Sequence, residues 1–173
     1  MNFYAGTLIL NCKNVDAFNI LSYLLTVPVI KACFSVDMNK LAAYGNVLEE
    51  LLLLYVPKVA KYLKASGYQY QTYIFDSGAS LFYANFSYFV ASEIWDAILD
   101  SPEIGLFRVG VTVFKTLEKE LLTMRADEVM MAVKFPCQHT TEEVFLKTLS
   151  KTEIKVKDFL RIKQKAMDDA KIL

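Results

Sequence analysis

The sequence predicts an all-α protein, built as a multi-helix bundle with antiparallel and orthogonal packing. Apolar residues recur at i, i+3 and i+4 along almost the whole chain, whereas the period-two alternation of half-buried strands is rare. Residue types that start helices, such as aspartate, serine and proline, stand just before many of these periodic runs. The 173 residues fit one domain, and the hydrophobic fraction of 54% suits helices with wide apolar faces.

Two helices are marked in the first half of the chain. Asp37 is a suitable N-cap for a long helix that runs to about Val56. Pro57 then suits the first position of a shorter helix, and Gly67 suits its C-terminal cap. We therefore expect two consecutive helices with a sharp break at Val56-Pro57.

A second break separates two further helices at Ser101-Pro102. Ser101 is expected to cap the second of them, Pro102 to occupy its first position and Glu103 to lie in its first turn. Each helix shows one apolar face. These faces contain Val90, Ile94 and Ile98 in the first helix, and Phe107, Gly110, Val111, Phe114, Leu117, Leu121 and Met124 in the second. Arg108, Thr112, Lys115 and Lys119 are expected on the opposite, polar face of the second helix.

The short turn between these helices predicts that they fold back on one another. Trp95, the only tryptophan, lies at the margin of the first apolar stripe, so we expect its ring to neighbour that of Phe107. Asp96 belongs to an acidic stripe on the same helix. We hypothesise that it forms a partly buried ion pair with Arg108, which would fix the packing of the pair.

The C-terminal region is more charged, and a boundary is predicted after Cys137. We assign residues 1–137 to one helical domain and residues 138–173 to a C-terminal helical extension. Thr140 with Glu143, and Ser150 with Glu153, have the spacing of capping boxes. The last helix has an expected apolar stripe of Val156, Phe159, Leu160, the stem of Lys163, Met167 and Ala170, which would dock on the core or on a neighbour.

Composition argues against several classes of function. The net charge is zero, so a nucleic-acid partner is not expected. Three cysteines without a C-x-x-C spacing, together with the single His139, give no expected metal site, and no phosphate-binding glycine loop or other cofactor motif is present. The longest uncharged runs, 17–30 and 77–92, are shorter than a membrane span. The high apolar content leaves two readings open: wide internal faces, or a surface that a partner or a further chain segment covers.

The order of motifs resembles the C-terminal part of a TBC domain, the family of GTPase-activating proteins for Rab GTPases. The family's [RK]-I-W-D helix, its L-F-R helix start and its E-x-x-L-L ending correspond to residues 93–96, 106–108 and 118–122. Residues 55–67, 80–82 and 1–3 resemble further family segments upstream. Glu93 departs from the family's basic residue before I-W-D, and Ser77-Gly78 departs from an aromatic position. The family-signature residues in this chain are Trp95, Asp96, Leu106, Phe107 and Arg108.

The resemblance implies a regulator of vesicle trafficking that binds a Rab-type small GTPase in the cytoplasm, including the surface of endomembranes. Such proteins activate a GTPase and are not enzymes themselves. The family supplies an arginine from I-x-x-D-x-x-R and a glutamine from Y-x-Q, and both motifs are expected to precede Met1. No catalytic residue is therefore assigned, and we expect this chain to lack activator catalysis. The alternatives are a non-catalytic module that binds a GTPase or scaffold, and a subunit of a larger assembly.

Overall fold

The computed structural model describes residues 2–83 and 86–172, and the regular secondary structure of these residues is entirely helical. Met1, which begins the predicted domain 1–137, and Leu173, which ends the predicted extension 138–173, lie outside these ranges. The all-α prediction is confirmed. The elements are α1 Asn2–Asn11, α2 Asn14–Leu24, α3 Pro28–Ser35, α4 Met38–Tyr55, α5 Pro57–Ala65, α6 Tyr70–Ser80, α7 Tyr88–Asp100, α8 Pro102–Thr116, α9 Glu118–Leu121, α10 Ala126–Lys134, the 3₁₀ helix η1 Pro136–Gln138, α11 Glu142–Lys151 and α12 Val156–Asp169.

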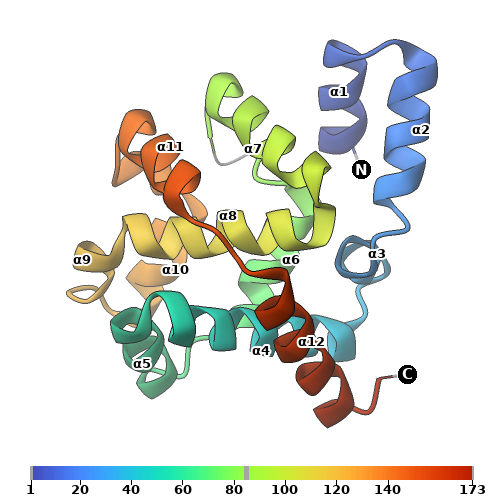
Figure 1. The fold of residues 1–173 in the computed structure, drawn as a ribbon. Coiled ribbons are helices and arrows are strands. Elements are labelled where there is room, and N and C mark those ends of the chain that lie inside the picture. The colour runs from blue at the N-terminus through green and yellow to red at the C-terminus, as the bar shows by residue number, and fades with distance from the viewer. Residues whose placement is uncertain (1, 84–85, 173) are drawn as a thin grey trace.

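Helix α8 runs through the middle of the molecule, with α7 and α11 on one side and α4 on the other (Figure 1). Its residues from Gly105 to Phe114 are buried except Arg108, which is half-buried. The polar face predicted for this helix is therefore only partly correct, because Thr112 is fully buried. Its hydroxyl donates a hydrogen bond of 2.8 Å to the carbonyl oxygen of Arg108, one turn earlier, and this bond satisfies the buried group.

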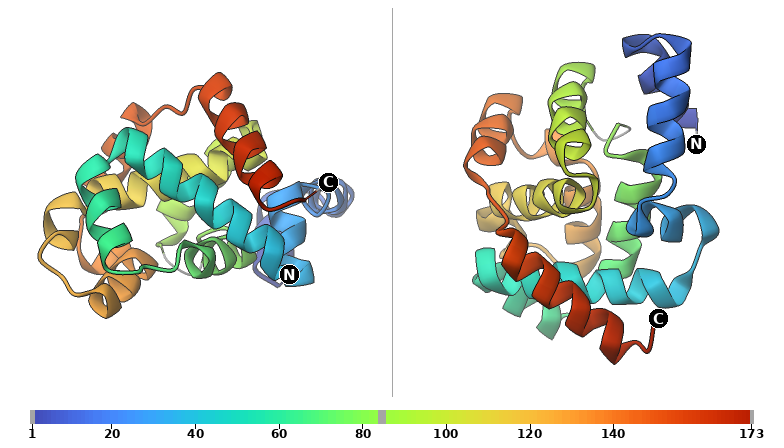
Figure 2. Two further views of the ribbon diagram at one scale, coloured as in Figure 1. Left: turned by 90° about the horizontal axis from the view of Figure 1, so that it is seen from below. Right: turned by 45° about the vertical axis from the view of Figure 1, so that its right-hand side comes forward.

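The long helix α4 begins and ends where the sequence predicts. The Asp37 side chain accepts a 3.1 Å hydrogen bond from the backbone N–H of Lys40, as an N-cap does. Pro57 then begins α5, and Gly67 follows it with a φ of +70°, a left-handed conformation that glycine adopts without strain. The views in Figures 1 and 2 show α12 lying across α4.

The C-terminal helices share the core with the rest of the chain. Phe145 and Leu149 of α11, and Phe159 and Ile162 of α12, are buried in the same hydrophobic cluster as α4, α7 and α8. No comparison tests the division at residue 137, which stays a prediction.

Two capping predictions for this region are wrong, and the predicted apolar stripe of the last helix is only partly correct, because Phe159 is buried and Met167 packs on the core while other members are exposed. The N-cap of α11 is Thr141, whose hydroxyl accepts from Val144 N, and not Thr140. Ser150 lies inside α11, so it does not begin the last helix, which starts at Val156. The buried stripe of α12 is Phe159, Ile162 and Ala166, while Val156 and Leu160 are 58% and 55% exposed.

The N-terminal helices α1 and α2 form a hairpin that stands beside the main bundle (Figures 1 and 2). Tyr4 anchors it: this ring is fully buried, and its hydroxyl donates a hydrogen bond to the carbonyl oxygen of Gly78 in α6. Across the described ranges, no single helix has the length and apolarity to cross a membrane. The pair α2 and α3, bent by 86° at its break, does meet both criteria when taken together.

Candidate functional site

The signature helices α7 and α8 cross in close contact beside Ser101. Gly105 makes the crossing possible, because a Cβ atom there would lie 2.5 Å from the carbonyl oxygen of Ala97 and 2.7 Å from Cα of Ile98. Both distances are shorter than any real Cβ contact, so only glycine fits without a shift of the backbone. The turn predicted at Ser101-Pro102 is confirmed, although the Ser101 side chain makes no capping hydrogen bond.

Trp95 and Phe107 are both buried in one core, but they contact different neighbours. Trp95 meets the ring of Tyr4 edge-on, at a centroid distance of 5.7 Å. Phe107 lies 6.1 Å from Tyr44 and 5.4 Å from Phe159. The predicted contact between the Trp95 and Phe107 rings does not occur in the described structure. Instead, Trp95 holds the N-terminal hairpin and Phe107 holds α4 and α12 against the central helix.

Arg108 binds the end of α11 and not Asp96. Its Nε donates to the carbonyl oxygen of Thr152 at 2.7 Å, and one terminal nitrogen donates to that of Leu149 at 2.9 Å. The last carbonyls of a helix have no partner within the helix and carry partial negative charge, so a guanidinium is well placed there. Asp96 is exposed, and no ion pair joins it to Arg108 in the part of the chain that the structure describes. The ion-pair hypothesis is wrong.

A polar network that includes Tyr44, a ring neighbour of Phe107, links three helices. Glu103, at the start of α8, accepts a 3.0 Å hydrogen bond from the Tyr44 hydroxyl of α4 and forms a 2.6 Å ion pair with Lys163 of α12. Burial, and then the nearby Glu103 carboxylate, raise the pKa of Tyr44, so this hydroxyl stays protonated and donates. Glu103 lies in the first turn of α8, as predicted, but its two partners lie 59 and 60 residues away and leave no local signal in the sequence.

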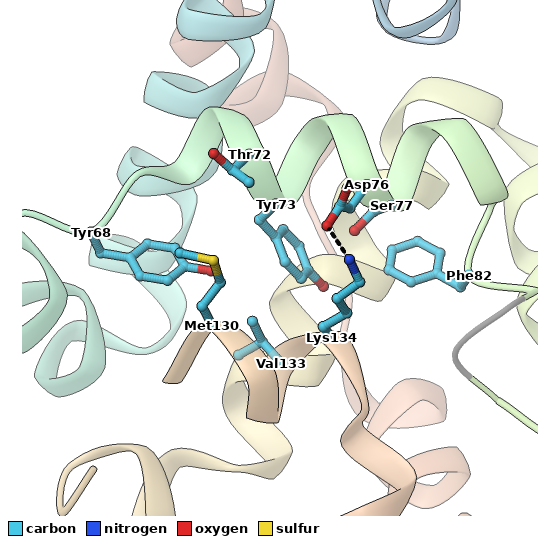
Figure 3. Close-up of a pocket in the computed structure, with 9 residues that line it drawn as sticks. All are labelled: Tyr68, Thr72, Tyr73, Asp76, Ser77, Phe82, Met130, Val133 and Lys134. Atoms are coloured by element: carbon cyan, nitrogen blue, oxygen red, sulfur yellow. Dashed lines mark hydrogen bonds and ion pairs between the residues drawn. The ribbon is translucent and has the colours of Figure 1, made fainter. Parts of the chain in front are cut away.

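A small, partly open cavity lies between α6 and α10 (Figure 3). Asp76 and Lys134 form an ion pair of 2.9 Å at its edge, and the hydroxyl of Tyr73 points toward that pair. The cavity measures about 20 Å³, which suffices for one water molecule and excludes a nucleotide or an organic cofactor.

The remaining arginines lie on the surface. Arg125 forms a 2.6 Å ion pair with Asp127, and Arg161 lies 3.9 Å from Asp158, one turn earlier on the same helix. Within the described ranges, no group of three or more histidine, cysteine, aspartate or glutamate side chains has the geometry to hold a metal ion.

Comparison with known proteins decides the family. The profile of the Rab-GTPase-TBC domain matches residues 1–122, which include both signature helices and most of the core. The chain belongs to this family. The TBC match ends at α9, so the profile does not include α10, α11 and α12.

Three similar proteins show how much of a longer protein the chain spans. TBC1 domain family member 12 of Mus musculus is 28% identical over 146 residues, which are 84% of this chain and 21% of that protein. The same protein of Xenopus tropicalis gives the same values. Drainin of Dictyostelium discoideum is 22% identical over 166 residues, 95% of this chain and 38% of that protein. The chain therefore spans between about a fifth and two fifths of the length of these relatives.

Proposed function

We propose that this chain is part of a TBC-type regulator of vesicle trafficking and supplies a helical platform that binds a Rab-type small GTPase. The family match over residues 1–122 is the observation that carries the proposal. The signature helices support it, because the α7–α8 crossing at Gly105 and the buried Trp95 and Phe107 form one rigid core. A rigid core of this kind holds a binding surface in a fixed shape.

The platform binds without accelerating hydrolysis on its own. Acceleration requires a cationic donor that is free to reach the transferred phosphate, and such an arginine contributes on the order of 10³ to 10⁵ in rate. Arg108 is committed to two backbone carbonyls. Arg125 and Arg161 each lie beside a carboxylate of their own segment, and neither belongs to an I-x-x-D-x-x-R sequence. Charge stabilisation at the nucleotide is therefore assigned to residues other than these three.

The test combines binding and hydrolysis for a panel of purified Rab-type GTPases loaded with GTP. We expect at least one to bind the chain, measured by biolayer interferometry, while its rate of phosphate release changes less than about twofold. Failure of every Rab-type GTPase to bind would contradict the partner. A rise in rate of about 10³-fold, abolished in Arg125→Gln or Arg161→Gln, would contradict the platform role and identify the missing donor.

The proposed location follows from the proposed partner: the cytoplasm and the cytoplasmic surface of endomembranes. Imaging of a tagged chain beside its bound GTPase tests this. A second function, as a subunit of a larger assembly, is favoured by the exposed apolar side chains of α1 and α2. It predicts that the isolated chain associates through that hairpin.

A further inference from the structure

A groove between α3, the first turn of α4 and the second half of α12 is lined by three lysine side chains. They are Lys31 of α3, Lys40 of α4 and Lys163 of α12, and we call this hollow the lysine groove. Its volume is about 590 Å³, in the range of sites that hold small organic molecules. In Figures 1 and 2, α12 ends close to α3 and to the start of α4. Three cations that are distant in the sequence therefore line one hollow.

The described lining of the lysine groove has an excess of positive charge. Asp168 is the only carboxylate among these lining residues, and one of its oxygens accepts a 2.7 Å hydrogen bond from the side chain of Gln164. Two of the lysines have acidic partners, Asp37 and Glu103, but neither of these carboxylates lines the groove. The groove is therefore cationic, although the whole chain has no net charge.

Two of the three ammonium groups are available to a ligand. Lys31 is exposed, and its ammonium group has no ion pair within the described ranges. Lys40 pairs at 3.3 Å with Asp37, and because both side chains are partly exposed this pair is weak in water. Asp37 caps α4 through a backbone N–H, so the cap persists when the Lys40 side chain turns away. Both lysines can therefore bind an anion without loss of a contact that holds the fold.

Lys163 is the anchored cation of the groove. Its side chain is 23% exposed, and its ammonium lies 2.6 Å from the Glu103 carboxylate, which also accepts from the buried Tyr44 hydroxyl. An ammonium group has three N–H donors, and this ion pair uses one of them. The pair therefore holds the Lys163 ammonium in place and leaves it donors for a ligand.

Phosphate is the anion that best matches this arrangement. A phosphate monoester carries a charge of about −1.5 to −2 near neutral pH and has three strong acceptor oxygens, so it can bind several ammonium groups at once. Pro28, Ala32 and Met167 add an apolar wall, which suits the carbon part of a phosphorylated molecule. A nucleic acid fits less well, because it requires a basic surface longer than three lysines.

We propose that the lysine groove binds a small ligand through its phosphate groups, which Lys31, Lys40 and Lys163 hold from three different helices. Soluble phosphorylated molecules and the phosphate monoesters of lipid headgroups share this chemistry. The proposal requires no GTPase, so its failure and that of the proposed function are distinguishable.

Isothermal titration calorimetry of the 173-residue chain with sodium pyrophosphate tests the site. The groove variant, Lys31→Gln with Lys40→Gln, should raise the dissociation constant at least about tenfold, because charge-assisted contacts are lost. The matched control is the α5 variant, Lys58→Gln with Lys61→Gln, which removes the same charge from exposed positions outside the groove. Its dissociation constant should stay within about twofold of the wild type, because salt screens distant surface charges. Circular dichroism verifies that both variants keep their helix content.

A second measurement requires no variant. Chemical acetylation of lysines, mapped by mass spectrometry, should slow at Lys31 and Lys40 when pyrophosphate is present and should not change at Lys58 and Lys61.

Vesicles of phosphatidylcholine that contain phosphatidic acid distinguish the two sources of phosphate. Sedimentation of the chain with these vesicles, lost in the groove variant, would assign the ligand to a lipid headgroup, and pyrophosphate binding without it would assign a soluble molecule. The proposal is overturned if neither probe binds at about 10 mM phosphate. It is also overturned if the α5 variant weakens binding as much as the groove variant does.

Discussion

Arg108 connects α8 to the end of α11, which lies more than forty residues further along the chain. One of its hydrogen bonds gives the carbonyl oxygen of Thr152 a donor beyond the helix end, and the other adds a second donor to the carbonyl oxygen of Leu149, which also accepts from the Thr152 backbone N–H. The bonds are charge-assisted, and the side chain is half-buried, so they are stronger than exposed surface contacts. At the residue scale, the basic residue of the L-F-R signature therefore has a structural role that joins the family-matched region to the C-terminal helices.

Replacement of Arg108 tests this role. Arg108→Ala should lower the free energy of unfolding by about 2 kcal/mol, because two charge-assisted bonds are lost and the carbonyl oxygen of Thr152 loses its donor. Urea denaturation measures the loss. The exposed Asp96 is the control: Asp96→Ala should change stability by less than about 0.5 kcal/mol, and the double variant should be additive. A coupling energy above about 1 kcal/mol between the two positions would restore the rejected ion pair.

The buried thiol of Cys33 gives a prediction for reactivity and pH. Its side chain is 2% exposed, and burial raises its pKa from 9.0 to about 12. Because the thiolate is the reactive form, iodoacetamide at neutral pH should label Cys12 and Cys137 in the folded protein and Cys33 only after unfolding. A raised folded-state pKa favours the folded protein below pH 9, and this contribution is lost as the pH rises toward 12.

Peptide mapping by mass spectrometry identifies the labelled sites, and denaturant curves between pH 8 and 12 measure the alkaline loss of stability. Cys33→Ala should weaken the pH dependence in that window, after allowance for the buried tyrosines that also titrate there. Rapid labelling of Cys33 in the folded chain would show that α3 and α6 open more readily than their packing implies.

At the scale of elements, local signals predicted some helices well and left others unplaced. Asp37, Pro57 and Pro102 act on the backbone within one turn, so the starts of α4, α5 and α8 were readable from the sequence. Helix α12 carries apolar residues on several sides, and periodicity alone could not select the face that docks. The face that docks is set by two contacts with α8, Phe159 with Phe107 and Lys163 with Glu103. Because these partners are distant in the sequence, they leave no local signal.

The glycines of α8 and α1 offer a matched pair of substitutions. Gly105→Ala should lower the free energy of unfolding by about 3 kcal/mol, because the new methyl group would press on the backbone of α7 at Ala97 and Ile98. Gly6→Ala meets nothing within 4 Å and should stabilise α1 by about 0.5 to 1 kcal/mol through its helix propensity. Thermal or urea unfolding measures both. Equal effects at the two sites would show that the α7–α8 crossing is looser than the structure indicates.

At the scale of the whole molecule, one core joins the TBC-matched residues to the helices that follow them. The ring centroid of Phe86, in the segment before α7, lies 4.6 Å from that of Phe145 in α11. The ring centroid of Phe107 lies 5.4 Å from that of Phe159 in α12. The family signature was readable because its motifs are linear. The boundary near residue 137 came from a change in charge content, which reports solvent exposure along the chain and not the contacts between helices.

A truncated chain of residues 1–137 therefore tests whether the region before the boundary is a domain. The truncation removes Phe145 and Phe159 from the core. Loss of one buried phenylalanine side chain lowers the free energy of unfolding by about 3 to 5 kcal/mol. Two such losses are comparable to the roughly 5 to 15 kcal/mol that stabilise a whole domain, so the truncated chain should not unfold cooperatively. Circular dichroism and binding of a hydrophobic dye measure this, with a chain that ends at Asp169 as the control because it keeps every buried residue of α12. If residues 1–137 unfold in one sharp transition at the temperature of the full chain, then α11 and α12 are an accessory extension, and the contacts of Arg108 with α11 contribute little to the stability of the domain.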